Sequence, residues 1–416
     1  MNKTFFLVLV VFFTVLSCKK ENNNNEDIVK KDFEFAGNQL TYAMTEIEKA
    51  IAEESPESKQ KRESKQQGPL ISPRSIEDGR LLMVVSKDWT SGFFPGELWY
   101  MYEYTKNPKW ELAAREYTDP LEREKLNGVT HDMGFKVYCS FGNGYRLTKD
   151  ENYKNILLQS AYTLTTRYKP NAKIIRSWDH NKDKWQSPVI IDNMMNLELL
   201  FWAFKESKDS LFYDIAVNHA KTTMKNHFRE DYSSYHVIDY DTITGEVLKK
   251  NTHQGFSHES AWSRGQAWAV YGYTMCYRET GLPEFLEQAK NVTNYIFTHP
   301  NLPKDLIPYW DYDAPEIPNE PRDVSAATVT ASALYELSLY DKGNAEKYVN
   351  WANTILTNLS NNYLAKYGED KGFLLLHSTG SKPGKFEVDA PLVYADYYFL
   401  EALLRKQKLE QTGTIF

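Results

Sequence analysis

Residues 190–209, IIDNMMNLELLFWAFKESKD, contain the unit from which the fold is predicted. Asp192 stands at the start of a helix that begins near Asn193, and Asp is a preferred residue at helix N-termini. The polar turn Ser207-Lys208-Asp209 ends this helix and starts the next one. A long loop rich in Trp, Asp and His precedes the first helix, whereas only the short turn precedes the second. The segment therefore forms a helical hairpin.

The same alternation of long loops and short turns continues along the chain. Twelve helices are predicted, of which the first spans Phe33–Glu54. The others begin near Gly96, Pro108, Met133, Asp150, Asn193, Asp209, Ser260, Pro283, Val324, Asn344 and Ala390. Every second helix follows an elaborate loop. From the third pair onward these helices recur about every 60 to 70 residues, which is typical of helical-hairpin repeats.

Six helical hairpins that close on themselves form an (α/α)6 barrel, with six inner helices and six outer ones. We predict this all-α fold as one domain over residues 33–408, with a C-terminal tail at 409–416. Residues 56–73 are expected to be a charged connection, and the strand-like pieces Tyr235–Asp239 and Phe373–His377 to belong to loops. Parallel inner helices would bring the long loops together at one mouth. An open helical superhelix is the alternative.

The N-terminus has the pattern of an export signal. The apolar run from Phe5 to Leu16, interrupted only by Thr14, is too short for a bilayer, which needs about 20 residues. Its ending, Leu16-Ser17-Cys18, resembles the lipobox of bacterial lipoproteins. We therefore expect a signal peptide at 1–17, acylation of Cys18, a tether at 18–32, and a lipoprotein on the periplasmic or outer face of the outer membrane. An ordinary cleaved signal is the alternative.

The composition excludes some classes of function. The net charge of −7, without a basic stripe, argues against a nucleic-acid partner. Aromatic residues make up 14 % of the chain; most fill the core, but those in loops beside Gly, His and Asp suit stacking on sugars. Cys139 and Cys276 lie in apolar helical contexts without metal-ligand spacing. We therefore expect free buried thiols, with no disulfide, metal site or cofactor.

Two aspartates are candidates for catalysis. Asp132, in the motif THDMGF, and Asp192 each open an inner helix, so both should point toward the shared mouth. Two carboxylates at one site can divide acid and base roles if their environments separate their pKa values. Helix capping is the alternative, because Asp323 and Asp389 occupy the same relative position. Asp132 and Asp192 lie beside loops with Gly, His and Trp residues, whereas Asp323 and Asp389 enter ordinary amphipathic helices. This difference favours catalysis by Asp132 and Asp192.

The segment 252–268, THQGFSHESAWSRGQAW, is the richest in functional side chains. Arg264 and Trp268 are four residues apart on a helix and share a face, which suits a ligand with a carboxylate and a sugar ring. A structural ion pair is the alternative role for Arg264. Three histidines lack the spacing of metal ligands and are interpreted as hydrogen-bond donors: His236, His253 and His258.

Five motifs together resemble the unsaturated glucuronyl hydrolases, glycoside hydrolase family 88. They are DWTSGFFPG at 88–96, HDMGF at 131–135, IIDNMMNL at 190–197, HQGFSHESAWSRGQAW at 253–268, and HSTG with EVDAPLVYADYYFLEAL between 377 and 403. The resemblance spans roughly residues 89–404, in family order and with compatible spacing. It implies the (α/α)6 fold and no cofactor.

The resemblance also implies roles for individual residues. Asp192 corresponds to the general acid and base, and Asp132 to the second essential aspartate, which raises the pKa of its neighbour. The substrate-binding residues correspond to Trp89, His131, Trp178, His236, Thr252, Gln254, Arg264 and Trp268. Members of the family hydrate the C4=C5 double bond of an unsaturated uronate at the non-reducing end of lyase products. The remaining sugar is then expelled.

The leaving sugar is not determined by these motifs. Family members that accept sulfated sugars carry Ser-x-x-Ser-x-Lys, and here Ser378 and Ser381 match while Lys382 falls one place early. A lipoprotein of this kind is expected to act on products of glycosaminoglycan lyases or of ulvan lyases, and the sequence does not choose between them. Two alternatives are an unsaturated rhamnogalacturonyl hydrolase of family 105, disfavoured by RGQAW at 264–268, and a non-catalytic glycan-binding lipoprotein of the SusD type.

Overall fold

The computed structural model describes residues 27–416. The expected signal peptide, Cys18 and most of the expected tether lie outside the described residues. Within 27–416, no helix combines the length and the apolar character needed to cross a bilayer. Cys139 and Cys276 are free and buried, as predicted.

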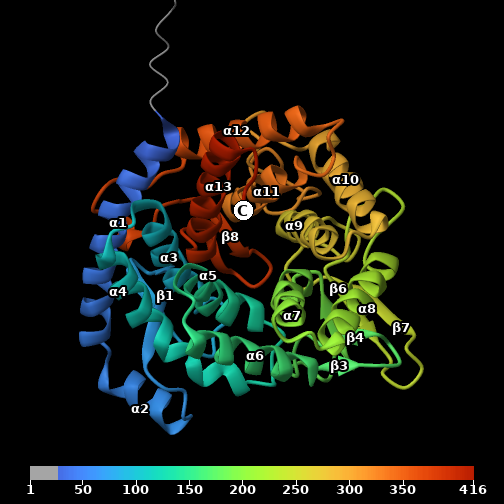
Figure 1. Cartoon of the computed structure of the whole chain (residues 1–416), viewed down its shortest axis with the longest axis horizontal. Coiled ribbons are helices and arrows are strands. Elements are labelled where there is room, and N and C mark those ends of the chain that lie inside the picture. Colours follow the sequence, from blue (N-terminus) through green and yellow to red (C-terminus); the bar gives the residue numbers. More distant parts are fainter. Residues whose placement is uncertain (1–26) are drawn as a thin grey trace, which may run out of the picture.

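Two concentric rings of helices make up the fold (Figure 1). The inner ring consists of α3 (Phe93–Thr105), a π-helix (Gly134–Gly142) continued by α5 (Asn143–Thr148), α7 (Asn193–Ser207), α9 (Ser263–Thr280), α11 (Val324–Leu337) and α13 (Val393–Thr412). The outer ring consists of α1 (Ile28–Ala52), α4 (Pro108–Thr118), α6 (Glu151–Thr165), α8 (Ser210–Asn226), α10 (Pro283–Thr298) and α12 (Ala345–Asn362). Each inner helix packs on the next, and α13 packs on α3. The ring therefore closes, which confirms the (α/α)6 barrel and excludes the open superhelix.

Local sequence explains why the two rings differ. The outer helices start with capping residues: the carboxylates of Asp150 and Asp209 accept hydrogen bonds from backbone N–H groups of α6 and α8, and prolines open α4 and α10. Outer helices bury one face only. The N-terminal parts of the inner helices are buried all round, and every residue of α11 is buried. Inner helices consequently position side chains in a fixed interior.

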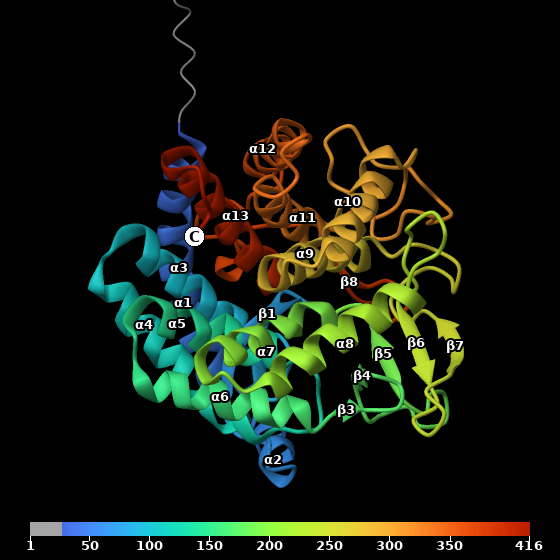
Figure 2. The same ribbon diagram turned by 45° about the vertical axis from the view of Figure 1, so that its right-hand side comes forward.

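Short strands lie in the loops between the helices. Hairpin β1 (Leu70–Glu77) and β2 (Arg80–Val85) follows the short helix α2 (Pro56–Ser64). Beside α8, β5 (Pro188–Ile190), β6 (Val237–Tyr240) and β7 (Val247–Asn251) form one antiparallel sheet (Figure 2). The remaining pairs are β3 (Tyr168–Lys169) with β4 (Ile174–Ile175), and β8 (Ser378–Ser381) with β9 (Phe386–Ala390). Two 3-10 helices, Asp119–Leu126 and Asp370–Gly372, complete the elements of the described chain.

Several predicted boundaries at the ends of the chain are wrong. Helix α1 begins at Ile28, so residues 28–32 belong to the barrel and not to a tether. Helix α13 extends to Thr412 and Ile415 is buried, so most of the predicted tail is part of the fold. The connection at 56–73 contains α2 and the start of β1.

Two further predictions around the last loops need correction. The strand predicted at Phe373–His377 is displaced, because β8 begins just after this segment. The strand predicted at Tyr235–Asp239 overlaps β6. Asp389 is not a helix cap: it lies in β9 with a φ of 54°, and α13 starts only at Val393.

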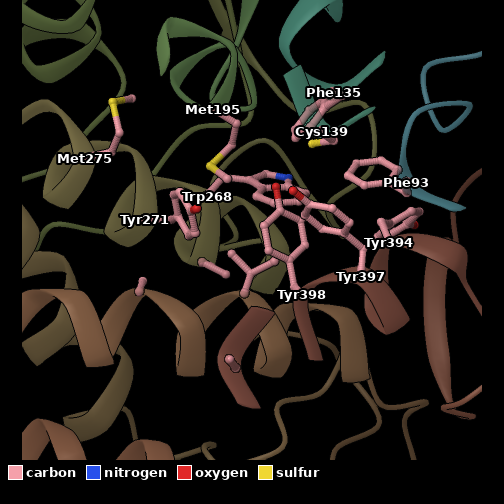
Figure 3. Packing of buried hydrophobic residues seen from close by; sticks show 14 of the residues in the cluster. Phe93, Phe135, Cys139, Met195, Trp268, Tyr271, Met275, Tyr394, Tyr397 and Tyr398 are labelled. Atoms are coloured by element: carbon pink, nitrogen blue, oxygen red, sulfur yellow. The ribbon is translucent and has the colours of Figure 1, made fainter. Parts of the chain in front are cut away.

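An aromatic floor crosses the interior of the barrel (Figure 3). It consists of the aromatic side chains of Phe135, Trp268, Tyr271 and Tyr398, together with Met195. The Trp268 ring centroid lies 5.3 Å from that of Phe135 and 5.5 Å from that of Tyr398. On one side of the floor lie the N-terminal ends of the inner helices. On the other side, toward their C-terminal ends, is a cavity of about 690 Å³.

Candidate functional site

Buried polar atoms without hydrogen-bond partners gather at one end of the barrel. Within residues 27–416 they include atoms of six side chains near the N-terminal ends of the inner helices: Trp178 Nε1, Asp192 Oδ2, His236 Nε2, Trp268 Nε1, Ser378 Oγ and Tyr394 OH. Buried polar groups are normally hydrogen-bonded, so this group indicates a place for a polar ligand. Five of these six side chains are predicted site residues.

The large cavity at the other end has the opposite character. Its charged residues pair with one another, for example Arg146 with Glu103 and Arg278 with Glu198 and Glu279. None of its lining residues has an unsatisfied buried side-chain atom within the described chain. The polar groups of this cavity are thus paired with one another. We therefore place the candidate site at the other end of the barrel, at the mouth above the aromatic floor.

Asp192 stands at the N-terminus of α7 but does not cap it. Its backbone is helical, and its side chain makes no capping hydrogen bond. The residue is 7 % exposed, and burial raises the pKa of its carboxyl to about 7. The positive charge of Arg264 opposes this rise, and the negative charge of Asp132 contributes a smaller increase. Asp132 thus acts in the expected direction, but burial is the main cause.

The loop before the π-helix brings Asp132 beside the start of α7. A Cβ atom on Gly134 would lie 2.7 Å from the Cα of Asn196, so only Gly permits this approach. Asn196 Oδ1 then accepts a hydrogen bond of 3.1 Å from the backbone N–H of Phe135. This contact joins the motif HDMGF to the motif DNMMN. It aligns the two aspartates at the same mouth.

His131 and Asp132 form a pair. His131 Nδ1 donates to the backbone carbonyl of Ser177 at 2.9 Å, and its Nε2 is 3.1 Å from Asp132 Oδ1. Asp132 Oδ2 accepts a hydrogen bond of 2.7 Å from Thr130 Oγ1. Burial lowers the pKa of His131, and the charge of Asp132 opposes that effect. The two side chains can share a proton between them.

His236 lies on the opposite side of Asp192. Its Nε2 is 3.7 Å from Asp192 Oδ2, and its ring packs on Trp262 with centroids 4.5 Å apart. Burial holds the pKa of His236 well below its ordinary value, with smaller contributions from His253 and Arg264. The imidazole is therefore neutral at physiological pH.

Arg264 is already paired inside the protein. Its Nη1 donates to Asp323 Oδ2 at 2.6 Å and to the Thr379 carbonyl at 2.7 Å, and Nη2 donates to the Gly380 carbonyl at 2.8 Å. Asp323 also caps α11. The ion-pair role, considered as an alternative, is thus present: Arg264 ties β8 to α9 and α11. Its contact with substrate stays a prediction.

The other predicted residues surround the same mouth. Trp89 packs on Tyr394 with ring centroids 4.8 Å apart, and Trp178 stacks on His180 at 5.2 Å. Gln254 Nε2 donates to the Gly380 carbonyl at 3.0 Å.

Three hydroxyl residues differ in their availability. Thr252 Oγ1 accepts from the Gly255 N–H at 2.8 Å, and Ser381 Oγ accepts from the Gly384 N–H at 3.1 Å, so both act in turns. The buried Ser378 Oγ has no partner in residues 27–416. Of the two serines, Ser378 is therefore the one whose hydroxyl is not already hydrogen-bonded within residues 27–416.

Tyr394 was missed by the sequence analysis. It opens α13 with a buried hydroxyl that has no partner among the described residues, and the Arg264 guanidinium carbon is 5.3 Å from its ring. The signal was its place in the motif EVDAPLVYADYY, after a loop. Residues 27–416 hold no cluster of three or more His, Cys, Asp or Glu side chains fit for a metal ion.

Several known proteins are similar to this chain in sequence. Residues 72–399 match the family model described as Glycosyl Hydrolase Family 88. The unsaturated glucuronyl hydrolase of Formosa agariphila is 55 % identical over 328 residues, which cover 78 % of this chain and 82 % of that protein. The unsaturated chondroitin disaccharide hydrolase of Streptococcus pneumoniae is 33 % identical over 327 residues, covering 77 % and 82 %.

Solved structures share the fold. The crystal structure of an unsaturated glucuronyl hydrolase specific for heparin superposes with a TM-score of 0.84 at 45 % identity, covering 92 % of this chain and 98 % of that one. The unsaturated glucuronyl hydrolase of Bacillus sp. GL1 gives a TM-score of 0.79 at 28 % identity, with the same coverage. These relatives favour the hydrolase over both alternatives considered from the sequence. The protein is a glycosidase, and its chain belongs to glycoside hydrolase family 88.

Proposed function

We propose that the protein removes the Δ4,5-unsaturated uronic acid from the non-reducing end of oligosaccharides made by polysaccharide lyases. The observation that carries the proposal is Asp192, a buried carboxyl with a pKa raised to about 7 and with one oxygen, Oδ2, that has no hydrogen-bond partner among residues 27–416. Such a group holds a proton near neutral pH and can transfer it to a bound substrate. The names of the relatives, unsaturated glucuronyl and unsaturated chondroitin disaccharide hydrolases, support this substrate class.

The proposed reaction is a hydration. Asp192 gives its proton to C4 of the vinyl ether, and the electrons of the double bond form the new C–H bond. Positive charge develops at C5 and the ring oxygen, a water adds at C5, and the Asp192 carboxylate takes the proton of that water. The product is a hemiketal whose ring opens. This converts C1 into a hemiacetal, which breaks down and releases the remaining sugar.

The neighbouring residues support these steps. Asp132 and His131 offer a carboxylate and an imidazole to the ring hydroxyls, and Trp89 and Trp178 offer aromatic surfaces to the sugars. The charge of Arg264 favours the substrate carboxylate near Asp192. It also limits the rise in the pKa of Asp192, so the same group can act as acid and then as base.

A direct assay tests the proposal. Unsaturated disaccharides prepared with chondroitin, hyaluronan, heparin and ulvan lyases absorb in the near ultraviolet, and the hydration removes this absorbance. Asp192→Asn should lower kcat by about 10²- to 10⁴-fold, the usual contribution of general acid catalysis. Asp389→Asn, a change at an exposed carboxylate outside the pocket, serves as the matched control. Persistence of the absorbance on all four substrates would overturn the proposal.

The leaving sugar is proposed from the contacts of Lys382. Its Nζ donates to the buried Glu320, which also accepts from Trp310 Nε1 at 2.8 Å. Lys382 is therefore the counter-ion of a buried carboxylate and is not free for a sulfate. We propose that unsulfated leaving sugars are preferred at this position. A lower kcat/KM for sulfated than for unsulfated chondroitin disaccharides is the expected result, and the reverse order contradicts it.

We also propose that the protein is exported and lipid-anchored through Cys18. The apolar run at 5–16 and the ending Leu16-Ser17-Cys18 support this proposal. Cys18→Ala should move the protein from the membrane fraction to the soluble fraction and abolish labelling by a fatty-acid analogue. Unchanged labelling would contradict acylation at this residue.

A further inference from the structure

Backbone hydrogen bonds fix the protonation of His236. Its Nδ1 accepts from the N–H groups of His253, at 3.1 Å, and Gln254, at 3.0 Å. A ring nitrogen that accepts hydrogen bonds carries no proton, and a neutral imidazole has one N–H. The proton of His236 is therefore on Nε2, the atom that lies 3.7 Å from Asp192 Oδ2.

A buried carboxylate holds the turn that supplies these two N–H groups. Asp311 is fully buried, and its Oδ2 accepts from the Phe256 N–H and from Ser260 Oγ, both at 2.8 Å. Its Oδ1 accepts from the Asp313 N–H at 2.9 Å. A Cβ at Gly255 would lie 3.1 Å from Asp311 Oδ2, so the glycine lets the carboxylate approach the turn closely. The turn at 253–256 cannot shift without breaking these bonds.

We infer that Asp311 is a positioning residue for the reaction. By holding the turn at 253–256, it fixes His236 as the Nε2–H tautomer and keeps an N–H, instead of a lone pair, directed at Asp192. This inference rests on the proposed function of Asp192 as the acid. The Asp311 side chain accepts hydrogen bonds from Phe256, Ser260 and Asp313, so its effect on Asp192 passes through the turn and His236.

The tautomer has a predictable effect on Asp192. An N–H facing the carboxylate favours its ionised form, whereas a lone pair favours the protonated form. The other charged or titratable groups around the His236 ring are His253, Arg264 and His227. Loosening the turn should therefore raise the pKa of Asp192, and the alkaline limb of the pH profile of kcat/KM should move to higher pH.

His131 provides an internal comparison. Its Nδ1 must carry a proton, because it contacts a backbone carbonyl, which can only accept. The main chain thus imposes opposite states on Nδ1 in the two site histidines. Asp311 has no contact with the Ser177 carbonyl that holds His131, so variants at 311 should leave His131 unchanged.

Nitrogen NMR of the full chain labelled at histidine tests the inference at pH 8, with the His236 signals assigned from the spectrum of His236→Gln. In the wild type, Nδ1 of His236 should give the signal of an unprotonated nitrogen and Nε2 that of a protonated one. Asp311→Asn keeps only one acceptor oxygen. It should mix the two tautomers, lower kcat/KM by about 10- to 100-fold and move the alkaline limb upward. Asp313→Asn, which affects the bond to the Ala261 N–H at 2.9 Å beyond the turn, is the control and should change none of these.

The outcomes separate the inference from the proposed function. A wild-type His236 protonated on Nδ1, or an Asp311→Asn spectrum identical to the wild type, overturns the inference even if activity falls. If Asp311→Asn does not fold, Gly255→Ala, whose Cβ would lie 2.7 Å from Thr252 Oγ1, should have the same effects. If the wild type shows the Nε2–H tautomer of His236 but has no activity on any unsaturated disaccharide, the role of Asp311 in fixing the tautomer is supported and the proposed function is overturned.

Discussion

Replacing Asp192 with Asn should stabilise the folded protein at neutral and alkaline pH while it removes catalysis. Burial raises the pKa of this carboxyl from 3.8 to about 7. The unfolded chain loses the proton more easily, so the free energy of unfolding falls as pH rises from about 4 to about 7 and stays low above that. With about 1.4 kcal/mol for each pKa unit, the loss is about 2 kcal/mol at pH 5 and about 4 kcal/mol at pH 8. Asn carries no charge and escapes this loss.

Thermal unfolding followed by circular dichroism measures the effect. Asp192→Asn should raise Tm by about 4 °C or more at pH 8 and by less than about 1 °C at pH 4, since the stabilisation appears only where the wild-type carboxyl ionises on unfolding. Asp389→Asn, at an exposed carboxylate, should show no such trend. An increase in Tm that is equal at both pH values, or a decrease at pH 8, would refute the assignment of a buried, proton-holding carboxyl.

Three more predictions follow from the same structure. Because the acid form of Asp192 disappears above its pKa of about 7, kcat/KM should fall about tenfold per pH unit above that value; a flat profile up to pH 9 contradicts this. Burial raises the pKa values of both Glu97 and Asp396, so their ionisation opposes folding as pH rises; Glu97→Gln should raise Tm at pH 8 and raise it less at pH 5, and equal Tm values of the variant and the wild type at pH 8 would contradict this. Gly134→Ala should lower kcat/KM at least about tenfold with the fold retained, because its Cβ meets the Asn196 backbone 2.7 Å away; wild-type kinetics would show that the approach of these loops does not matter.

The double ring was predictable because its signals are local. Caps such as Asp150 and Asp209, and prolines such as Pro108 and Pro283, mark outer helices where the sequence analysis expected them. The start of α13 was predicted near Ala390 and lies at Val393, because Asp389 resembles a cap yet belongs to a hairpin. That hairpin is defined by pairing between strands, and a local pattern does not contain it.

The sequence was sufficient to predict which residues lie at the candidate site, but not their ion pairs or their protonation. The motifs placed Asp132 and Asp192 at one mouth. However, the partner of Arg264 is Asp323, 59 residues away, and the burial that raises the pKa of Asp192 comes from the packing of several helices. Side-chain states of this kind depend on contacts between distant segments, and spacing along the chain does not encode them.

The direction of the inner helices has an electrostatic consequence. An outer helix runs back along the barrel before each inner helix, so the N-terminal ends of the inner ring meet at the mouth that holds Asp192. A helix N-terminus carries roughly half a positive charge, and aligned helices add their fields. The protein has a net charge of −7, yet a uronate approaching this mouth meets a local field of the opposite sign. Capture of anionic sugars should therefore slow as salt is added, since screening weakens that field over about 10 Å at 0.1 M ionic strength.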